Sequence, residues 1–161
     1  MAVIIWVAEG TWASCVDAAR GYVPTDADVV LLHMSGEDVA AAAHGAFSGL
    51  LGRGHPERDP GAQVTALAVG AAAELLDAAA QRIGRPTRRI ARTGRIEREV
   101  VHAADGAELL IVARDGDRSR LGPHSLAPAT RFVVDHAPCP VLLVWPESAP
   151  GIASIPSPPS H

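Results

Sequence analysis

Four short apolar runs constrain the fold of this chain more than any other feature of its sequence. They lie at residues 3–8, 29–34, 109–113 and 141–145, and none of them alternates between apolar and polar residues. Alternation marks a sheet with one face in water, whereas a continuous run marks a strand that is covered on both faces. Strands of that kind form parallel sheets between two layers of helices. A fifth candidate strand, Arg88–Thr93, has Ile90 as its only large apolar residue, so we expect it at an edge of the sheet.

Helical patterns separate these strands. The best defined covers residues 61–83, where apolar residues recur at helical spacing behind Asp59 as the N-cap and Pro60 as the first helical residue. Gly84 and Pro86 end it. The other predicted helices are residues 12–22, 37–51, 96–104 and 126–136. The alternation predicts a doubly wound, open parallel sheet with helices on both faces.

Composition excludes several classes of function. A net charge of -4 argues against a general nucleic-acid binder, and the absence of lysine removes P-loop and Schiff-base enzymes. Neither the seven histidines nor Cys15 and Cys139 show metal-ligand spacing, and two cysteines without a signal peptide indicate the reducing cytoplasm. No apolar run approaches the roughly 18 residues of a membrane span. We expect a cytoplasmic protein with no metal, no membrane contact and no enzymatic activity.

Two segments fall outside the α/β pattern. Residues 52–60 form a turn-rich break, and their role is open. Residues 147–161 are rich in proline and serine and cannot bury a core, so we divide the chain into a domain over residues 1–146 and a disordered tail over residues 147–161.

The stretch from residue 106 to residue 145 reads as a buried strand, a polar loop, a helix and a second buried strand. In an open α/β sheet, ligands bind beside such a loop because free backbone N–H groups and the helix dipole favour anions. This loop, however, is short of glycine and rich in arginine and aspartate.

Three segments resemble the universal stress protein family, and the resemblance covers residues 3–146. Residues 4–19, IIWVAEGTWASCVDAA, resemble its first strand, acidic-Gly-Ser turn and helix, with Glu9, Gly10 and Thr11 at the turn. Residues 29–34, VVLLHM, resemble its second strand. Residues 135–145, DHAPCPVLLVW, carry the most specific match. The resemblance implies a five-stranded sheet in the order 3-2-1-4-5 and a homodimer formed through the last strand, from Val141 to Trp145. Self-pairing there would cover an edge that is too apolar to leave bare.

ATP-binding members of that family carry Gly-x-x-Gly, nine residues, then Gly-Ser/Thr after the fourth strand. Aligned on the ending, this chain has Arg114, Asp117, Ala127 and Pro128 at those four positions and keeps only a later hydroxyl, Thr130. Each departure prevents a close approach between the backbone and the nucleotide, places a negative charge beside the phosphates, or removes a hydrogen-bond donor. Losing one charge-assisted hydrogen bond costs about 1.5–3 kcal/mol, or roughly 10–150-fold in affinity. We therefore expect that ordinary ATP binding is lost.

The opposing interpretation stays open. Arg114, Arg118 and Arg120 could bind phosphate through side chains, although Asp115 and Asp117 could instead neutralise them within the loop.

If a nucleotide binds, Glu9 and Met34 match positions that line the family's adenine and ribose pocket; they equally fit a turn acid and a core methionine. The sequence thus favours a stress-response regulatory module that acts as a homodimer on an unknown protein partner, without a cofactor. The alternative is a switch for ATP, another nucleotide or another anion.

Overall fold

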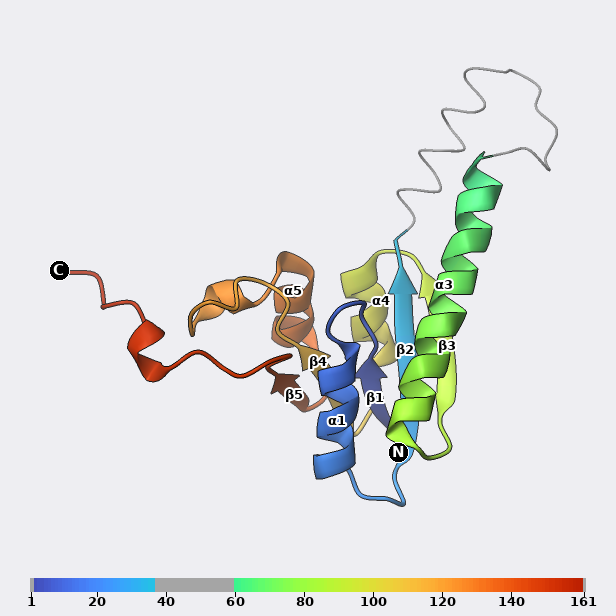
Figure 1. Ribbon diagram of the computed structural model, residues 1–161, viewed down its shortest axis with the longest axis horizontal. Coiled ribbons are helices and arrows are strands. Elements are labelled where there is room, and N and C mark those ends of the chain that lie inside the picture. Colours follow the sequence, from blue (N-terminus) through green and yellow to red (C-terminus); the bar gives the residue numbers. More distant parts are fainter. Residues whose placement is uncertain (1, 37–59, 161) are drawn as a thin grey trace.

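A computed structural model of the protein describes residues 2–36 and 60–160. Its strands form one five-stranded sheet in the order β3-β2-β1-β4-β5, and every neighbouring pair is parallel (Figure 1). The predicted strand order and fold class are therefore confirmed. The predicted helix over residues 37–51 and most of the turn-rich break lie outside the described residues.

The elements follow one another in strict alternation over the described chain. The strands are β1 (Ala2–Trp6), β2 (Asp28–Ser35), β3 (Arg88–Thr93), β4 (Leu109–Ala113) and β5 (Val141–Val144). The helices are α1 (Trp12–Tyr22), α3 (Pro60–Ile83), α4 (Ile96–Ala103) and α5 (Pro128–His136), with short 3-10 turns η2 (Pro123–Ser125) and η3 (Ile152–Ser154).

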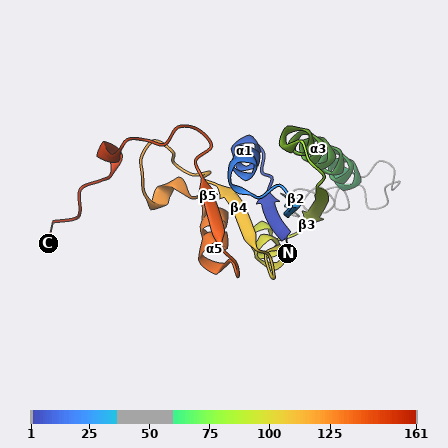
Figure 2. The same cartoon turned by 90° about the horizontal axis from the view of Figure 1, so that it is seen from below.

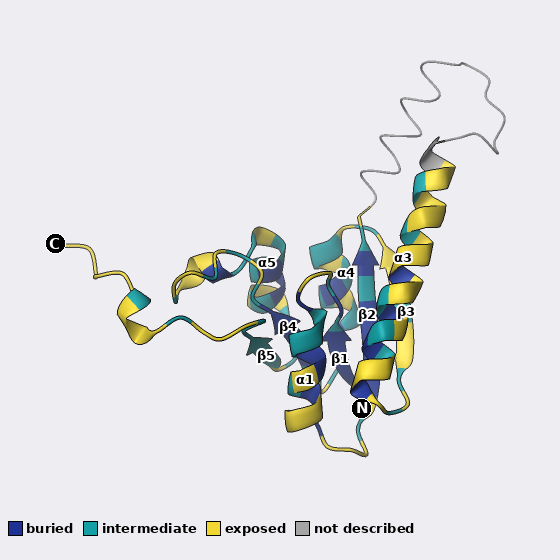
Figure 3. Cartoon of the chain, viewed as in Figure 1, coloured by how far each residue is buried: buried dark blue, intermediate teal, exposed yellow. Residues whose placement is uncertain are grey.

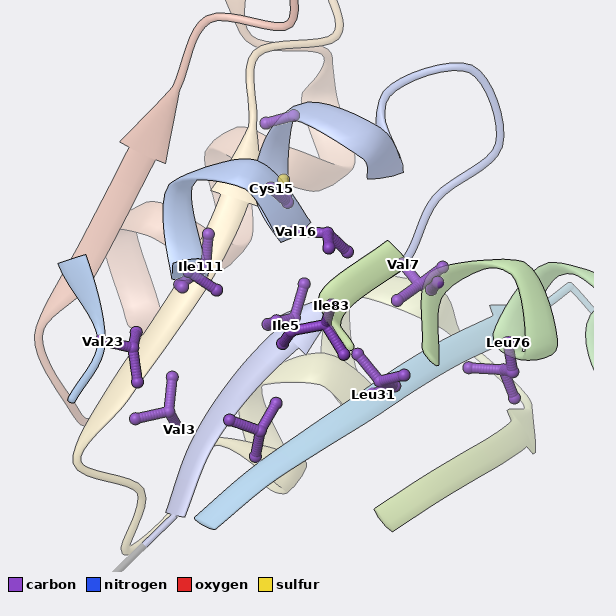
Figure 4. Close-up of a cluster of buried hydrophobic side chains, with 14 residues drawn as sticks. Val3, Ile5, Val7, Cys15, Val16, Val23, Leu31, Leu76, Ile83 and Ile111 are labelled. Carbon is purple, nitrogen blue, oxygen red and sulfur yellow. The ribbon is translucent and has the colours of Figure 1, made fainter. Parts of the chain in front are cut away.

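Two hydrophobic cores lie on the two faces of the sheet. Successive strand residues point to opposite faces, so odd-numbered residues such as Ile5 and Leu31 pack beneath α1 and α3 (Figure 4). Even-numbered residues such as Leu32 and Leu110 pack on the other side, where α4 and α5 lie (Figure 2). This arrangement explains the continuous apolar runs, because neither face of β1, β2 or β4 meets water.

The two edge strands differ in character. Five of the six residues of β3 are exposed and Ile90 is half-buried, as expected for a polar edge (Figure 3). All four residues of β5 are half-buried, since β4 covers one side of the strand and its other side has no neighbouring strand among the described residues. An apolar edge of this kind is an aggregation hazard unless another strand covers it.

Helix α5 begins at Pro128, two residues later than predicted. The N–H of Leu126 bonds to the carbonyl of Pro123 at the end of η2, and Ala127 is extended. Pro128 then suits the first helical position, which has no intrahelical partner for an N–H. The loop before the helix is therefore longer than the sequence pattern indicated.

Helix α3 extends past the end of the sheet (Figure 1). Its second half contributes Ala72, Leu76 and Ala79 to the core, while the first half is largely exposed. The stretch Ala62–Ile83 is long and apolar enough to cross a membrane by length and composition alone, and no other helix among the described residues is. A core helix of a soluble protein passes the same test, so the expected lack of membrane contact stays a prediction.

The segment after β5, residues 146–160, contains no strand or α-helix, only the turn η3. It nonetheless makes specific contacts with the rest of the chain. The Ser154 hydroxyl accepts the N–H of Leu121 at 3.0 Å, and Glu147 forms an ion pair with Arg118. We call this stretch the C-terminal segment; its separation from the domain as a disordered tail stays a prediction.

Candidate functional site

The loop that joins β4 to α5, residues 114–127, occupies the carboxyl end of the sheet, where ligands bind in open α/β folds (Figure 1). We call it the β4–α5 loop. The N-terminus of α5 closes one end of it, with the partial positive charge that attracts anions.

The chain itself supplies an anion to this helix N-terminus. Asp115 accepts the N–H of Ala127 at 2.9 Å through Oδ1 and the hydroxyl of Thr130 at 2.7 Å through Oδ2. Thr130 is the third residue of α5 and is almost completely buried. The carboxylate therefore satisfies a backbone donor and fixes the Thr130 hydroxyl, the one part of the family's ATP motif that this chain keeps.

The backbone of the loop bonds to itself. The N–H groups of Gly116 and Asp117 donate to the carbonyls of Ser125 and His124, each at 2.8 Å. A side chain at Gly116 would collide with this pairing, because a Cβ there would lie 2.3 Å from the His124 carbonyl oxygen. Glycine is thus required at 116 for a close approach between two parts of the loop, rather than for an approach to a ligand.

Asp117 also has its partners within the loop. Its Oδ1 accepts the N–H of Ser119 at 3.0 Å and the Ser119 hydroxyl at 2.6 Å, and Arg120 approaches Oδ2 at 3.4 Å. The hydrogen bonds from Ser119 hold the pKa of Asp117 below its ordinary value, and Arg120 adds to the effect. An aspartate that bonds to the backbone two residues on forms a local turn.

Arg114 folds back toward β5. Its backbone N–H continues the ladder to the Val144 carbonyl at 2.9 Å, and its guanidinium lies over the Trp145 ring, 4.6 Å from the centroid. Nη1 donates to the hydroxyl of Ser125, a fully buried residue whose hydroxyl in turn donates to the Gly122 carbonyl. The Nε atom is buried without a hydrogen-bond partner, and burial lowers the pKa of the guanidinium.

The C-terminal segment holds the outer side of the loop. Arg118 pairs with Glu147 through Nε and Oε1 at 3.0 Å, so its charge is engaged by the C-terminal segment. The Ser154 hydroxyl receives the Leu121 N–H and donates to the Gly151 carbonyl. Of the three loop arginines, only Arg120 therefore pairs with a carboxylate of the loop itself.

Two cavities lie near this end of the sheet. One, of about 610 Å³, is bounded by the β4–α5 loop and the start of α5 and includes Gly116, His124 and Arg131. The other, of about 300 Å³, lies against α3 and includes Glu9, Glu74 and His33. His33 Nδ1 lies 2.7 Å from the Val7 carbonyl, which can only accept, so Nδ1 carries the proton.

The residues that the sequence proposed as nucleotide contacts lie in separate places; they are Glu9, Met34, Arg114, Arg118 and Thr130. Arg114 and Thr130 meet opposite ends of the loop, and Arg118 meets the C-terminal segment. Glu9 is exposed in the cavity against α3. Met34 is buried in the core on the opposite face of the sheet, among residues that pack with α4. Each residue therefore has a structural position in the folded chain, and Met34 lies on the other face of the sheet from the cavity that Glu9 lines.

Sequence reasoning missed the contacts that organise the loop, since it considered Asp115 only as a partner for the loop arginines. Asp115 reaches partners twelve and fifteen residues away, and Ser125 joins Arg114 to the turn before α5. A local pattern does not reveal such contacts. Gly116 was visible as a glycine, but only the paired backbone around it explains why no side chain fits.

Among the described residues, no three His, Cys, Asp or Glu side chains are grouped so that they could hold a metal ion. Of the two thiols, Cys15 lies on the buried side of α1 and is completely buried, and burial raises its pKa to about 12. Cys139 is half-buried, and burial raises its pKa as well. Neither thiol has the lowered pKa that marks a reactive cysteine.

Solved structures share this architecture. The hypothetical protein MJ0577 superposes with a TM-score of 0.69 at 16% identity, over 92% of this chain and 97% of that one. Universal stress protein UspA from Lactobacillus plantarum gives 0.56 at 18% identity, over 89% and 97%. A universal stress protein in complex with cAMP gives 0.56 at 15% identity, over 91% and 98%. At these identities the likeness shows the fold alone.

No curated protein sequence matches this chain significantly. The sequence profile of the universal stress protein family, by contrast, matches residues 18–144. That span runs from the middle of α1 to the last residue of β5, so it includes the β4–α5 loop and four of the five strands. The chain belongs to the universal stress protein family.

Proposed function

We propose that this protein is a cytoplasmic stress-response module that acts by protein contact as a homodimer, and that its own residues fill the anion site of the fold. The observation that carries the proposal is Asp115, whose carboxylate lies at the N-terminus of α5. A phosphate bound there would have to displace a carboxylate that already holds the Ala127 N–H and the Thr130 hydroxyl.

The chemistry of the loop opposes a polyanion in three further ways. The N–H groups of Gly116 and Asp117 are engaged by carbonyls on the other side of the loop. Pro128 has no N–H to donate. Asp115 and Asp117 add two negative charges next to any phosphate. The same features favour a loop that is stable without a ligand.

The described hydroxyls near the site also support a role without catalysis. The Thr130 hydroxyl donates to Asp115, and the Ser125 hydroxyl donates to the Gly122 carbonyl while it receives Arg114. Thr130 and Ser125 are both almost completely buried, so neither hydroxyl is accessible to a substrate. We therefore propose a binding module and no enzyme.

Nucleotide titrations of the purified protein test the proposal. We expect Mg-ATP, AMP and cyclic AMP at sub-millimolar concentration to leave the melting temperature unchanged and to give no heat in calorimetry. A matched variant restores the family pattern through R114G, D117G, A127G and P128S together. We expect ATP to raise the melting temperature of this variant. A rise of several degrees for the unmodified chain would overturn the proposal, as would equal ATP affinity in both proteins.

A second candidate function is a nucleotide- or anion-binding switch. It is favoured by Arg114, a cation whose described partners are a hydroxyl and an aromatic ring and whose Nε lacks an acceptor. A structural neighbour is a universal stress protein in complex with cAMP. Binding of cyclic AMP or inorganic phosphate that weakens in Arg114→Gln and persists in Arg95→Gln would establish this switch in place of the closed site. Arg95 is an exposed arginine outside the loop.

A further inference from the structure

Two isoleucines in the C-terminal segment are exposed although the segment around them is held in place. Ile152 is 81% exposed and Ile155 is 55% exposed. They are three residues apart in and directly after the 3-10 turn η3, a geometry that places both side chains on one side. Between them, Ser154 anchors the segment, because its hydroxyl accepts the Leu121 N–H and donates to the Gly151 carbonyl. The segment therefore presents a small, fixed apolar surface.

The C-terminal segment leaves the sheet in a defined direction. It follows β5 directly and projects past the free edge of that strand, away from β4 (Figures 1 and 2). Any strand that paired with the free edge of β5 would belong to a molecule lying against this segment. The most direct occupant is a second copy of this chain, because the same edge is available on both.

The symmetry of such a pair fixes what the segment would meet. Two β5 strands that pair antiparallel about a two-fold axis keep the same sheet face on the same side. The carboxyl end of one β5 then lies beside the amino end of the other. A cavity of about 630 Å³ opens at that amino end, with Val3, Val23 and Leu109 in its lining. Tyr22 also lines it and is 77% exposed.

The wall of this cavity is held in position. Arg85, after α3, donates to the carbonyls of Pro24 and Ala27 in the turn that follows α1. Asp26, Asp28 and Glu108 supply the charged part of the lining. A neutral apolar side chain avoids the repulsion that a further acid would meet here, and the one acid of the C-terminal segment, Glu147, already pairs with Arg118.

The segment is long enough to reach the cavity of a partner. The eight residues from Trp145 to Ile152 span at most about 28 Å when fully extended, and less with the contacts to Arg118 and Leu121 in place. Strands in a sheet are about 4.8 Å apart, so β4 and β1 of a paired copy would lie about 10 and 14 Å from β5.

We propose that the C-terminal segment is a dimer arm, which places Ile152 and Ile155 of one copy into the Tyr22-lined cavity of the other. This proposal rests on the homodimer proposed above. The arm adds a second contact between the two copies, separate from the pairing of the β5 strands. The β4–α5 loop orients the arm through its contacts with Ser154 and Glu147.

Mixed-protomer cross-linking tests the arm. One protein carries Ile152→Cys and the other carries Tyr22→Cys, both with Cys139→Ser; Cys15 stays because it is completely buried. Equal mixing followed by mild oxidation is expected to give a disulfide-linked heterodimer. The matched control replaces Tyr22→Cys by Leu67→Cys, which is equally exposed (74%) but lies on α3, remote from β5. We expect no heterodimer in the control.

Sedimentation equilibrium on the unmodified protein separates the two proposals. A monomer at all concentrations would defeat both the homodimer and the arm. A dimer whose Ile152→Cys and Tyr22→Cys protomers fail to cross-link would defeat the arm alone. In a cross-linking dimer, Ile152→Asp with Ile155→Asp is expected to weaken the dimer by about tenfold or more, whereas Leu67→Asp leaves the dissociation constant unchanged. An unchanged constant in the double variant, with the fold verified by circular dichroism, would also overturn the arm.

Discussion

At the scale of single residues, the arginines and aspartates of the β4–α5 loop are compatible with two opposite predictions, an anion-binding loop and a loop whose charges are satisfied internally. The departures at Arg114, Asp117, Ala127 and Pro128 could be predicted from the sequence because the family pattern has fixed spacing. The role of Asp115 could not, since its partners are brought to it by the turn η2 and the start of α5. An arginine–aspartate loop can bind an anion or satisfy itself, and only the fold distinguishes the two.

Removing the Asp115 carboxylate is expected to destabilise the protein. Asp115→Ala leaves the Ala127 N–H and the buried Thr130 hydroxyl without their acceptor, a loss of about 1–2 kcal/mol in the free energy of unfolding. Urea denaturation measures it. Asp135→Ala is the control on the same helix, because Asp135 is exposed near the C-terminus of α5, where a negative charge gains nothing from the dipole. Equal stability of Asp115→Ala and the unmodified protein would show that the cap contributes nothing.

At the scale of elements, local patterns located most of the described helices and strands. The predicted bounds of α1, β3 and β4 agree with the structure, because turn residues mark both ends of each segment in the sequence. The start of α5 was wrong by two residues since Leu126 is held by the turn η2, a preference that the helical pattern does not contain. Contacts between elements are harder to predict from the sequence than the elements themselves. The ion pair between Asp17 of α1 and Arg82 of α3, for example, was not predicted.

That pair is expected to make stability depend on pH. Arg82 donates two hydrogen bonds to Asp17, at 2.9 and 2.7 Å, and these hold the pKa of Asp17 below its ordinary value. A lowered pKa in the folded state stabilises the fold above the unfolded pKa, near 4, and this contribution is lost as pH falls through the folded pKa. The melting temperature of Asp17→Asn should therefore be below that of the unmodified protein at pH 7.

The difference between the two melting curves should shrink as the pH falls below about 4, and added salt should also reduce it because the pair is solvent-exposed. Asp105→Asn, an exposed acid in the turn after α4, is the control and should show no such pH-dependent difference. A gap between Asp17→Asn and the unmodified protein that widens in acid would contradict the assigned direction of the pKa shift.

At the scale of the whole molecule, the sequence predicted the layers by itself but the strand order only through the family resemblance. Continuous apolar runs require cover on both faces, and the two cores supply it. No periodicity states which strand lies beside which. The polar character of β3 correctly placed it at an edge, whereas β5 is an edge despite its apolar sequence. The apolar sequence of β5 at an exposed edge is the physical reason to expect a second copy of the chain against that edge.

A proline in β5 tests the pairing of two copies. The carbonyls of Pro140 and Val144 bond to β4, so by alternation the N–H and C=O of Leu143 point away from it. Leu143→Pro removes an outward N–H without breaking the inner ladder, and we expect a folded monomer by light scattering with size-exclusion chromatography. Leu143→Val keeps the N–H and should remain dimeric. A dimeric Leu143→Pro protein would place the interface elsewhere.

The carboxylate at the start of α5 belongs to the same polypeptide as the helix that it caps. Its local concentration is consequently the same in every copy, whatever the cellular supply of small phosphorylated metabolites. If the site is closed as proposed, the conformation of the β4–α5 loop does not change with the concentration of nucleotides in the cell. The quantity left for a cell to vary is the number of molecules it synthesises, and with it the fraction that meets a second copy.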